Sequence, residues 1–166
     1  MKVLETERLT LRRMTTDDAP FILELLNEPG FIRFVADRGL RTNADAVTYI
    51  TDKVLPSYAQ FGFGYYIVEL KESGVPIGSC GLQKRETLED VDIGYSLLEK
   101  YCKQGFAYEA AAALYQYGRD VLQLPRIVAM TATDNHSSIK LLEKLGLRFE
   151  KMIDLPGYAG ESKLFV

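Results

Sequence analysis

Hydrophobic positions along this chain follow two periods, one typical of strands and one typical of helices. Thr15 and Asp18 stand at capping-box spacing, and the helix that they open has an apolar stripe that stops at Pro29. A second helix is predicted from Thr42 to a stop near Pro56. Alternation of apolar and polar residues, or enrichment in aromatic and β-branched residues, predicts strands at residues 8–14, 64–70, 76–82 and 91–98. The last three of these are expected to be successive antiparallel strands.

The second half of the chain contains a long helix between two apolar strands. Apolar residues recur at helical spacing from Phe106 to Val121, and Pro125 ends this pattern. The strand predicted at residues 126–132 is then parallel to the strand before the helix, because a strand–helix–strand unit is a crossover. A further helix, capped by Gly146, precedes two short strands. These elements predict one α+β domain over residues 1–166, with a central mixed, mostly antiparallel sheet of six or seven strands flanked by about four helices.

The turn at residues 101–110 is the stretch most indicative of a ligand. It leads into the long helix, whose first backbone N–H groups have no partner within the helix. Gly105 lets a ligand approach the backbone closely, Ala107 keeps the next turn position small, and Lys103 adds a cation where the helix dipole is already positive. The turn therefore predicts a site for a phosphate or diphosphate. A helix start with a glycine for close packing would have the same pattern.

Composition excludes several classes of protein. Hydrophobic residues make up 47% and charged residues 26% of the 166 residues, and the net charge of −3 with interspersed Lys and Arg argues against a nucleic-acid surface. No apolar run approaches the ~20 residues of a membrane span, and the first residues lack the core of a signal peptide, so we expect a cytoplasmic protein without a membrane partner.

Motif chemistry excludes further classes. Cys80 and Cys102 make no disulfide framework and, with His136 as the only histidine, no zinc site; both are expected to be small core or pocket-wall residues. The glycine-rich phosphate loop, the Gly-x-Gly-x-x-Gly fingerprint and the serine-hydrolase elbow are all absent from the sequence.

Two motifs in order resemble the GNAT superfamily of N-acetyltransferases. Gly105 and Ala107 match the acyl-CoA-binding turn Gln/Arg-x-x-Gly-x-Gly/Ala, although Cys102 stands where the family has Gln, Arg or Trp. The form Gly-Phe-Ala-Tyr-Glu-Ala is similar to the branch of ribosomal-protein N-terminal acetyltransferases. The second motif, Asn-x-x-Ser followed by Glu-Lys-Leu-Gly, occupies residues 135–146. The resemblance covers nearly the whole chain and implies acetyl-CoA as the cosubstrate, with its pantetheine arm in a slot where the two parallel strands splay apart.

The resemblance also implies which residues hold the cofactor. Backbone amides of the turn are expected to bind the diphosphate, and the end of the preceding strand to pair with the pantetheine amides. The residues concerned are Lys103, Gln104, Gly105, Phe106, Ala107 and Tyr108 for the diphosphate, and Leu97, Leu98 and Asn135 for the arm. The two leucines can equally be core residues, since only their backbone would act, and Asn135 can also cap its helix.

Acyl transfer to an amine requires a neutral nucleophile, a polarised thioester carbonyl and a proton for the departing thiolate. Many family members place a tyrosine acid seven residues after the asparagine, and here that position is Leu142. Ser138 is the remaining candidate, as in the ribosomal-protein branch, although a hydroxyl that satisfies a first-turn N–H fits the position as well. A triad of His136 with Ser137 or Ser138 is disfavoured because neighbouring side chains on a helix do not face each other.

No strong base stands out in the sequence. Asp92 occupies the position of a family glutamate and is expected to orient a water, and Glu69 and Glu89 are weaker candidates. At pH 7 an α-amine with a pKa of about 8 is roughly one-tenth neutral, whereas lysine with a pKa of about 10.4 is neutral in roughly one molecule in 2,500. The weak base therefore favours an α-amine, such as a peptide or protein N-terminus.

Alternative functions stay open. The acceptor amine can belong to an antibiotic, a polyamine or an amino acid, and the chain can be a non-catalytic module that holds acyl-CoA or, least favoured, a phosphate-binding protein unrelated to CoA. Acceptor specificity is expected in residues 31–41, in the second helix and in residues 154–161. A homodimer is also considered, because the apolar strand at residues 162–166 would need an edge to pair with.

Overall fold

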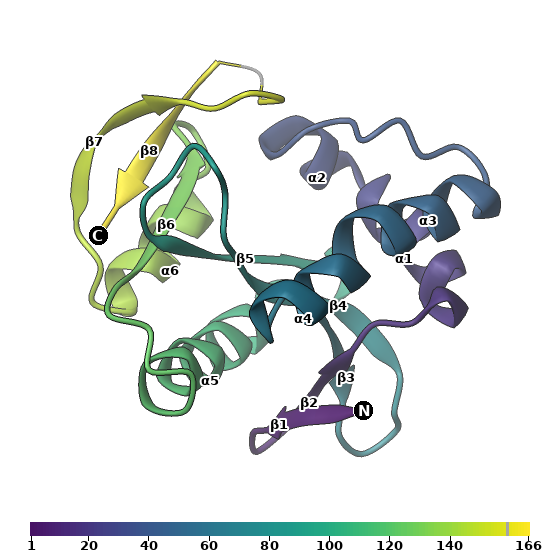
Figure 1. Ribbon diagram of the computed structural model, residues 1–166. Coiled ribbons are helices and arrows are strands. Elements are labelled where there is room, and N and C mark those ends of the chain that lie inside the picture. The colour runs from purple at the N-terminus through teal and green to yellow at the C-terminus, as the bar shows by residue number, and fades with distance from the viewer. Residues whose placement is uncertain (159) are drawn as a thin grey trace.

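A computed structural model describes residues 1–158 and 160–166 (Figure 1). The strands of the described chain are β1 (Lys2–Glu5), β2 (Leu9–Arg13), β3 (Tyr65–Leu70), β4 (Pro76–Gln83), β5 (Val91–Leu97), β6 (Ile127–Ala132), β7 (Phe149–Asp154) and β8 (Glu161–Phe165). The α-helices are α1 (Ala19–Leu26), α2 (Pro29–Phe34), α3 (Asn43–Tyr49), α4 (Leu55–Phe61), α5 (Phe106–Asp120) and α6 (His136–Lys144). Short helical turns are η1 (Thr16–Asp18), η2 (Ile50–Val54) and η3 (Glu99–Tyr101).

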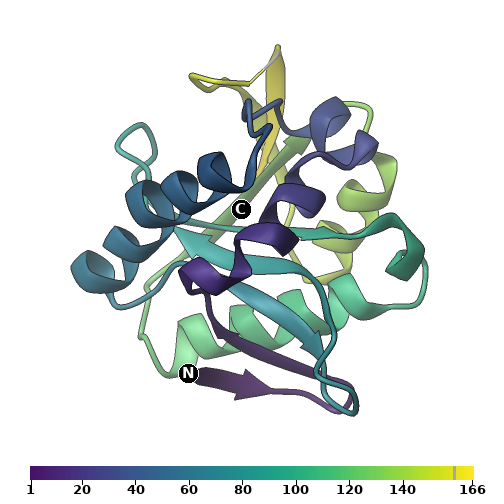
Figure 2. The same cartoon turned by 90° about the vertical axis from the view of Figure 1, so that its right-hand side faces the viewer.

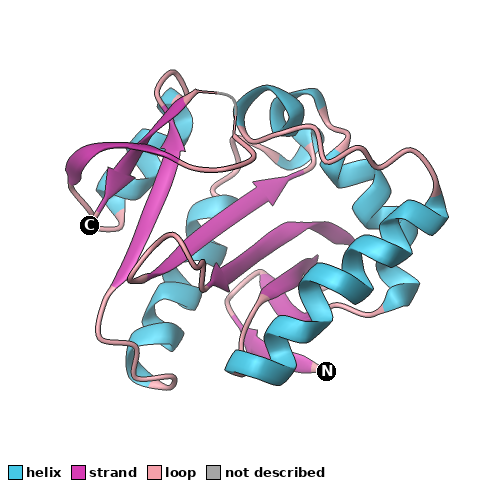
Figure 3. Cartoon of the chain, turned by 45° about the horizontal axis from the view of Figure 1, so that its top comes forward, coloured by secondary structure: helices cyan, strands magenta, loops and turns pink. Residues whose placement is uncertain are grey.

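The strands form one mixed sheet in the order β1-β2-β3-β4-β5-β6-β8-β7. Neighbouring strands are antiparallel except β5 and β6, as the crossover through α5 requires. These two strands pair only at Val91 with Ile127 and at Asp92 with Val128, and they then diverge (Figure 3). The expected splayed parallel pair is therefore confirmed, and it leaves a gap in the middle of the sheet.

Helices cover both faces of the sheet. In Figure 2 the helices α1, α3 and α4 lie in front of the strands and α5 lies behind them. Gly118 permits the close approach of α5, because a Cβ there would lie 2.7 Å from Ile127 Cδ1 and 3.2 Å from Leu82 Cδ1. None of the helices in the described residues is both long and apolar enough to span a bilayer.

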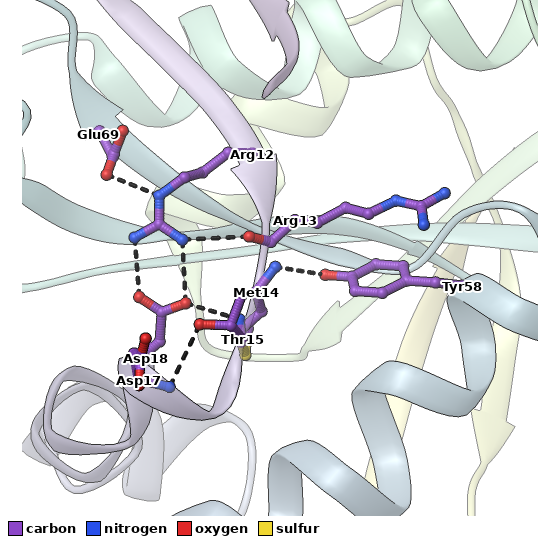
Figure 4. Close-up of polar contacts among 8 residues, drawn as sticks. All are labelled: Arg12, Arg13, Met14, Thr15, Asp17, Asp18, Tyr58 and Glu69. Atoms are coloured by element: carbon purple, nitrogen blue, oxygen red, sulfur yellow. Dashed lines mark hydrogen bonds and ion pairs between the residues drawn. The ribbon is translucent and has the colours of Figure 1, made fainter. Parts of the chain in front are cut away.

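An ion-pair cluster fastens the first helical segment to the sheet (Figure 4). Arg12 of β2 donates two hydrogen bonds to Asp18, of 2.8 and 3.0 Å, and one of 2.7 Å to Glu69 of β3. The predicted capping box of Thr15 and Asp18 is confirmed at the start of η1. Nearby, the Met14 amide donates to the hydroxyl of Tyr58 from α4 (3.0 Å). The helical turn η1 and helix α4 are thus both held to residues 12–14, at the end of β2.

The structure corrects several expectations about elements. The sheet has eight strands, because residues 2–5 pair with β2 as β1 although they carry no distinctive pattern. Pro29 does not simply stop a helix, since it occupies the first turn of α2, where its missing N–H costs nothing. Pro56 likewise lies in the first turn of α4, and a single π-helical turn, η2, joins α3 to α4 without a break.

Two further expectations are wrong. Strand β8 lies between β6 and β7, so it is not an edge in need of a partner, and the reason given for a homodimer does not hold. Cys102 is exposed rather than in the core or in a pocket wall, whereas Cys80 is buried as expected. The edge strands of the described sheet are β1 and β7.

Candidate active site

The N-terminus of α5 presents a row of unpaired backbone amides. Gly105 caps the helix with a φ of 83°, and the first hydrogen bond along α5 runs from the Glu109 amide to the Gly105 carbonyl (3.0 Å). In the described chain the preceding amides of Phe106, Ala107 and Tyr108 therefore have no carbonyl partner within the helix. Their N–H groups and the helix dipole together favour an anion at this position.

The turn before α5 is held by Arg8, the residue that directly precedes β2. Arg8 donates its amide and Nε to the carboxylate of Glu109 (2.9 and 2.7 Å) and its Nη1 to the Gln104 carbonyl (3.1 Å), while its guanidinium lies 4.3 Å from the centre of the Phe106 ring. Burial alone would raise the pKa of Glu109, but its hydrogen bonds from Thr6 and Arg8 outweigh this and lower the pKa. Glu109 therefore anchors the turn to residues 6 and 8, and Arg8 places a second cation beside the free amides.

A cavity of about 380 Å³ passes through the gap between β5 and β6. Successive strand residues point to opposite faces of a sheet, yet Gly94, Tyr95 and Ser96 all line this cavity. Residues of α1, α2, α3 and α4 line it on one side of the sheet, and Asn135, Ser138 and Leu142 line it from α6 and the turn before it. The cavity thus connects the α6 side of the gap with the helices on the opposite face.

Ser138 and Tyr95 meet across the gap. The Tyr95 hydroxyl lies 2.7 Å from Ser138 Oγ, and either oxygen can be the donor. Burial raises the pKa of Tyr95 to about 12, partly offset by this hydrogen bond, so the phenol is protonated at neutral pH. Asn135 caps α6 by accepting the Ser138 amide on its Oδ1 (3.3 Å). Leu142, at the position where many family members have a tyrosine, is buried in the same cavity.

Asp92 lies in the cavity wall and is the last residue of β5 that pairs with β6. Its side chain is buried and accepts a hydrogen bond from Arg85 Nε (3.0 Å), and Arg85 Nη2 donates to the hydroxyl of Tyr158 (2.9 Å). Burial raises the pKa of Asp92, and the charge and hydrogen bond of Arg85 oppose this rise. The other two candidate bases lie elsewhere: Glu69 binds Arg12, and Glu89 is exposed in the β4–β5 connection.

The structure therefore divides the predicted site residues into two groups. Asp92, Asn135 and Ser138 line one cavity, whereas the turn residues from Lys103 to Tyr108 lie outside its lining, at the head of α5. Leu97 ends β5 between the two groups. Leu98 follows it, and its amide already donates to the Ile77 carbonyl (2.9 Å) while its carbonyl accepts the Tyr101 amide (2.9 Å).

The sequence did not predict which side chains contact Ser138, Asp92 and the start of α5. Tyr95, Arg8, Arg85 and Tyr158 carry no local signal, because each acts through a residue that is 7 to 101 positions away in the chain. The expected specificity segments do reach the cavity: Val35 and Arg38 from residues 31–41 line it, as does Tyr158 from residues 154–161. Ala159, within the latter segment, lies outside the described residues.

Comparison with known proteins gives a consistent family. The family model described as "Acetyltransferase (GNAT) domain" matches residues 8–148. A Bacillus licheniformis protein named "Uncharacterized N-acetyltransferase p20" is 31% identical over 157 residues, which are 92% of this chain and 86% of that protein.

Solved structures share the fold. An acetyltransferase from Agrobacterium tumefaciens aligns with a TM-score of 0.82 and 25% identity over 99% of this chain and 92% of that one. RimL, a ribosomal L7/L12 α-N-protein acetyltransferase solved with coenzyme A, aligns with a TM-score of 0.84 over 99% of this chain and 96% of that one. Its identity is 16%, so this likeness concerns the fold alone.

Proposed function

Because the chain belongs to the GNAT acetyltransferase family, we propose that it acetylates a primary amine, with the α-amine of a peptide or protein N-terminus as the leading acceptor. The protein is an acyltransferase, and acetyl-CoA is its cosubstrate. The observation that carries the proposal is the pairing of free amides at the head of α5 with a gap in the adjacent parallel strand pair. An anion fixed at the amides would direct an attached chain into that gap.

The head of α5 holds the diphosphate in this proposal. Amides from Gln104 to Tyr108 supply the donors, and Lys103 supplies a cation. A hydrogen bond to a charged group contributes roughly 1.5–3 kcal/mol, so several together account for tight binding. Leu97, Leu98 and Asn135 border the path of the pantetheine arm toward Ser138. The Leu98 amide and carbonyl already form hydrogen bonds within the protein, so Leu98 can offer the arm only apolar contact. Leu97 lies on β5 beyond the last residue that pairs with β6.

Ser138 is the proposed proton donor. When bound, acetyl-CoA supplies an activated acetyl group that forms a bond to the amine nitrogen while its carbon–sulfur bond breaks and the sulfur departs as a thiolate. Tyr95 can donate its hydroxyl proton to Ser138 Oγ, which leaves the Ser138 proton directed toward the thiolate. Tyr95 is thus a positioning residue: it orients the Ser138 hydroxyl. The pair of Ser138 and Tyr95 takes the place of the tyrosine acid that many family members have at the position of Leu142.

Asp92 is the proposed acceptor of the amine proton, through a water. Its raised pKa makes the carboxylate a better base than an ordinary aspartate, and Arg85 keeps it ionised. Because Asp92 is buried beside the cavity, a water between it and the amine fits the geometry better than direct contact. This weak base is suited to an amine that is already partly neutral at pH 7.

A small-molecule amine is the second candidate acceptor. The cavity volume of about 380 Å³ falls in the range of roughly 300–1,000 Å³ that is usual for small ligands. A peptide N-terminus would have to place only its first residue or two in the same space.

A thiol-release assay with a panel of amines tests the function. We expect CoA release from acetyl-CoA to depend on the acceptor, with α-amines turned over faster at pH 7 than ε-amines of lysine. Calorimetric binding of CoA without turnover of any amine would instead identify a non-catalytic CoA-binding module.

A further inference from the structure

The cavity that contains Ser138 is more cationic than anionic. Its charged lining residues in the described chain are Arg38, Lys53, Lys84 and Asp92. The one carboxylate, Asp92, is already paired with Arg85 at 3.0 Å. Lys84 is held by the backbone carbonyls of Arg85 and Leu88. The described chain thus offers no free carboxylate in this cavity to a cationic ligand.

Arg38 and Lys53 are the two lining cations with uncommitted charge. Neither forms an ion pair with a carboxylate of the described residues. Lys53 lies on the π-helical turn η2, and Arg38 lies in the connection that follows α2. Both residues are exposed, and both line the cavity together with residues of α1, α2, α3 and α4.

Tyr158 brings two guanidinium groups to the same part of the wall. The Arg38 guanidinium lies 5.7 Å and the Arg85 guanidinium 5.3 Å from the centre of its ring. Together with Asp92, this cluster has a formal charge of +1 before Lys53 is counted. The neighbouring lining is aromatic and comes from Phe31, Phe34 and Phe61.

We propose that the acceptor is an α-amine that carries a carboxylate close to the amine, which Arg38 and Lys53 bind while the aromatic wall packs against an apolar side chain. This proposal rests on the proposed acetyltransferase function and names its substrate class. A free α-amino acid and an acidic peptide N-terminus share this chemistry. A polyamine does not, because each additional ammonium group would face the same two cations.

The same charges assist the chemistry. A cation near an ammonium group lowers the pKa of that group, so a larger fraction of the bound amine is the neutral nucleophile. Burial raises the pKa of three phenols that line the cavity, those of Tyr49, Tyr65 and Tyr95, so these groups are uncharged at neutral pH. Arg38 and Lys53 would therefore replace part of the function of the missing strong base.

Matched acceptors provide the test. We would measure kcat/KM for phenylalanine, phenylalaninamide and spermidine, and for a peptide pair that differs only in Asp or Asn at the second residue. After each kcat/KM is corrected for the fraction of the amine that is neutral at the assay pH, we expect a preference for phenylalanine over its amide, or for the Asp over the Asn peptide. The pair with the larger preference shows whether the acceptor is an amino acid or a peptide. Arg38→Gln and Lys53→Gln should each reduce that preference roughly three- to tenfold. Lys140→Gln removes a charge that does not line the cavity and should not change it.

Binding of the acetylated products tests the carboxylate-binding site independently of the acetyltransferase activity. In CoA-loaded protein, N-acetylphenylalanine should bind more tightly than N-acetylphenylalaninamide by calorimetry. If no amine is turned over but this difference is found, the acetyltransferase function fails and the anion site stands. Faster turnover of spermidine or of the neutral acceptors, or equal or undetectable binding of both products, would overturn the anion site and leave the function intact.

Discussion

At the scale of single residues, the backbone conformation at the head of α5 leaves the amides accessible to a ligand at some cost in stability. Gly105 has a φ of 83°, and Lys103, which has a side chain, is also left-handed with a φ of 63°. Such a conformation costs an L-residue with a side chain roughly 1–2 kcal/mol. The strain at Lys103 is tolerated where the amides of the turn must face outward, which is the pattern expected of a binding loop.

Gly105→Val tests whether the conformation of Gly105 is needed for CoA binding. The added side chain is strained at this φ, and its Cβ would lie 3.3 Å from Arg8 Nη2. We expect CoA affinity, measured by calorimetry, to fall roughly 10–100-fold as one or two charged hydrogen bonds are lost. Gly74→Val is the matched control, because Gly74 also has a positive φ (72°) but lies in the β3–β4 turn. Equal loss of CoA affinity in both variants would refute a local role for Gly105.

The Ser138–Tyr95 pair is tested by kinetics. Ser138→Ala should lower kcat by roughly 10²-fold, the usual contribution of a positioned acid, with little change in CoA affinity. Tyr95→Phe should lower kcat less and should change the pH profile of kcat, because only the orientation of the serine proton is lost. Ser137→Ala, at the exposed neighbouring position, is the control. Wild-type kcat in Ser138→Ala would exclude the serine as the acid.

At the scale of elements, the site depends on segments that are fixed to the sheet on each side of the gap. Glu109 and Arg8 fasten the start of α5 to β2, and Arg12 fastens η1 to β2 and β3 (Figure 4). Met14 and Ile22, which follow Arg12 in the chain, line the cavity. The Arg12–Asp18 pair thus helps to position one wall of the cavity.

The free energy of unfolding of Asp18→Asn, measured at two pH values, tests the Arg12–Asp18 ion pair. Burial would raise the pKa of Asp18, but hydrogen bonds from Arg12 and Thr15 outweigh it, and the folded pKa is lowered. A lowered pKa contributes stability above the unfolded value of about 3.9 and loses it as pH falls through the folded value. We expect a loss of about 2–3 kcal/mol at pH 7, measured by urea unfolding, and a much smaller loss at pH 3. Asp17→Asn, at the exposed neighbour, should have little effect at either pH. A loss for Asp18→Asn that is equal at both pH values would contradict the ion-pair explanation.

At the scale of the molecule, periodicity and the crossover rule predicted the sheet, the parallel pair and the position of the turn that begins α5. Strand β1 was missed because four residues carry too little pattern, and α2 and α4 because a proline can begin a helix as well as end one. The candidate site was predicted only in part. Ser138, Asp92 and the turn came from motifs, but Tyr95 is 43 residues from Ser138 and Tyr158 is 73 residues from Arg85, so their contacts exist only in the folded chain.

A crystal structure of the protein with bound CoA tests the central claim most directly. We predict the diphosphate within hydrogen-bonding distance of the amides from Gly105 to Tyr108, the pantetheine arm between β5 and β6, and the sulfur directed toward Ser138. A diphosphate bound elsewhere on the surface, with the head of α5 empty and the gap unfilled, would contradict it.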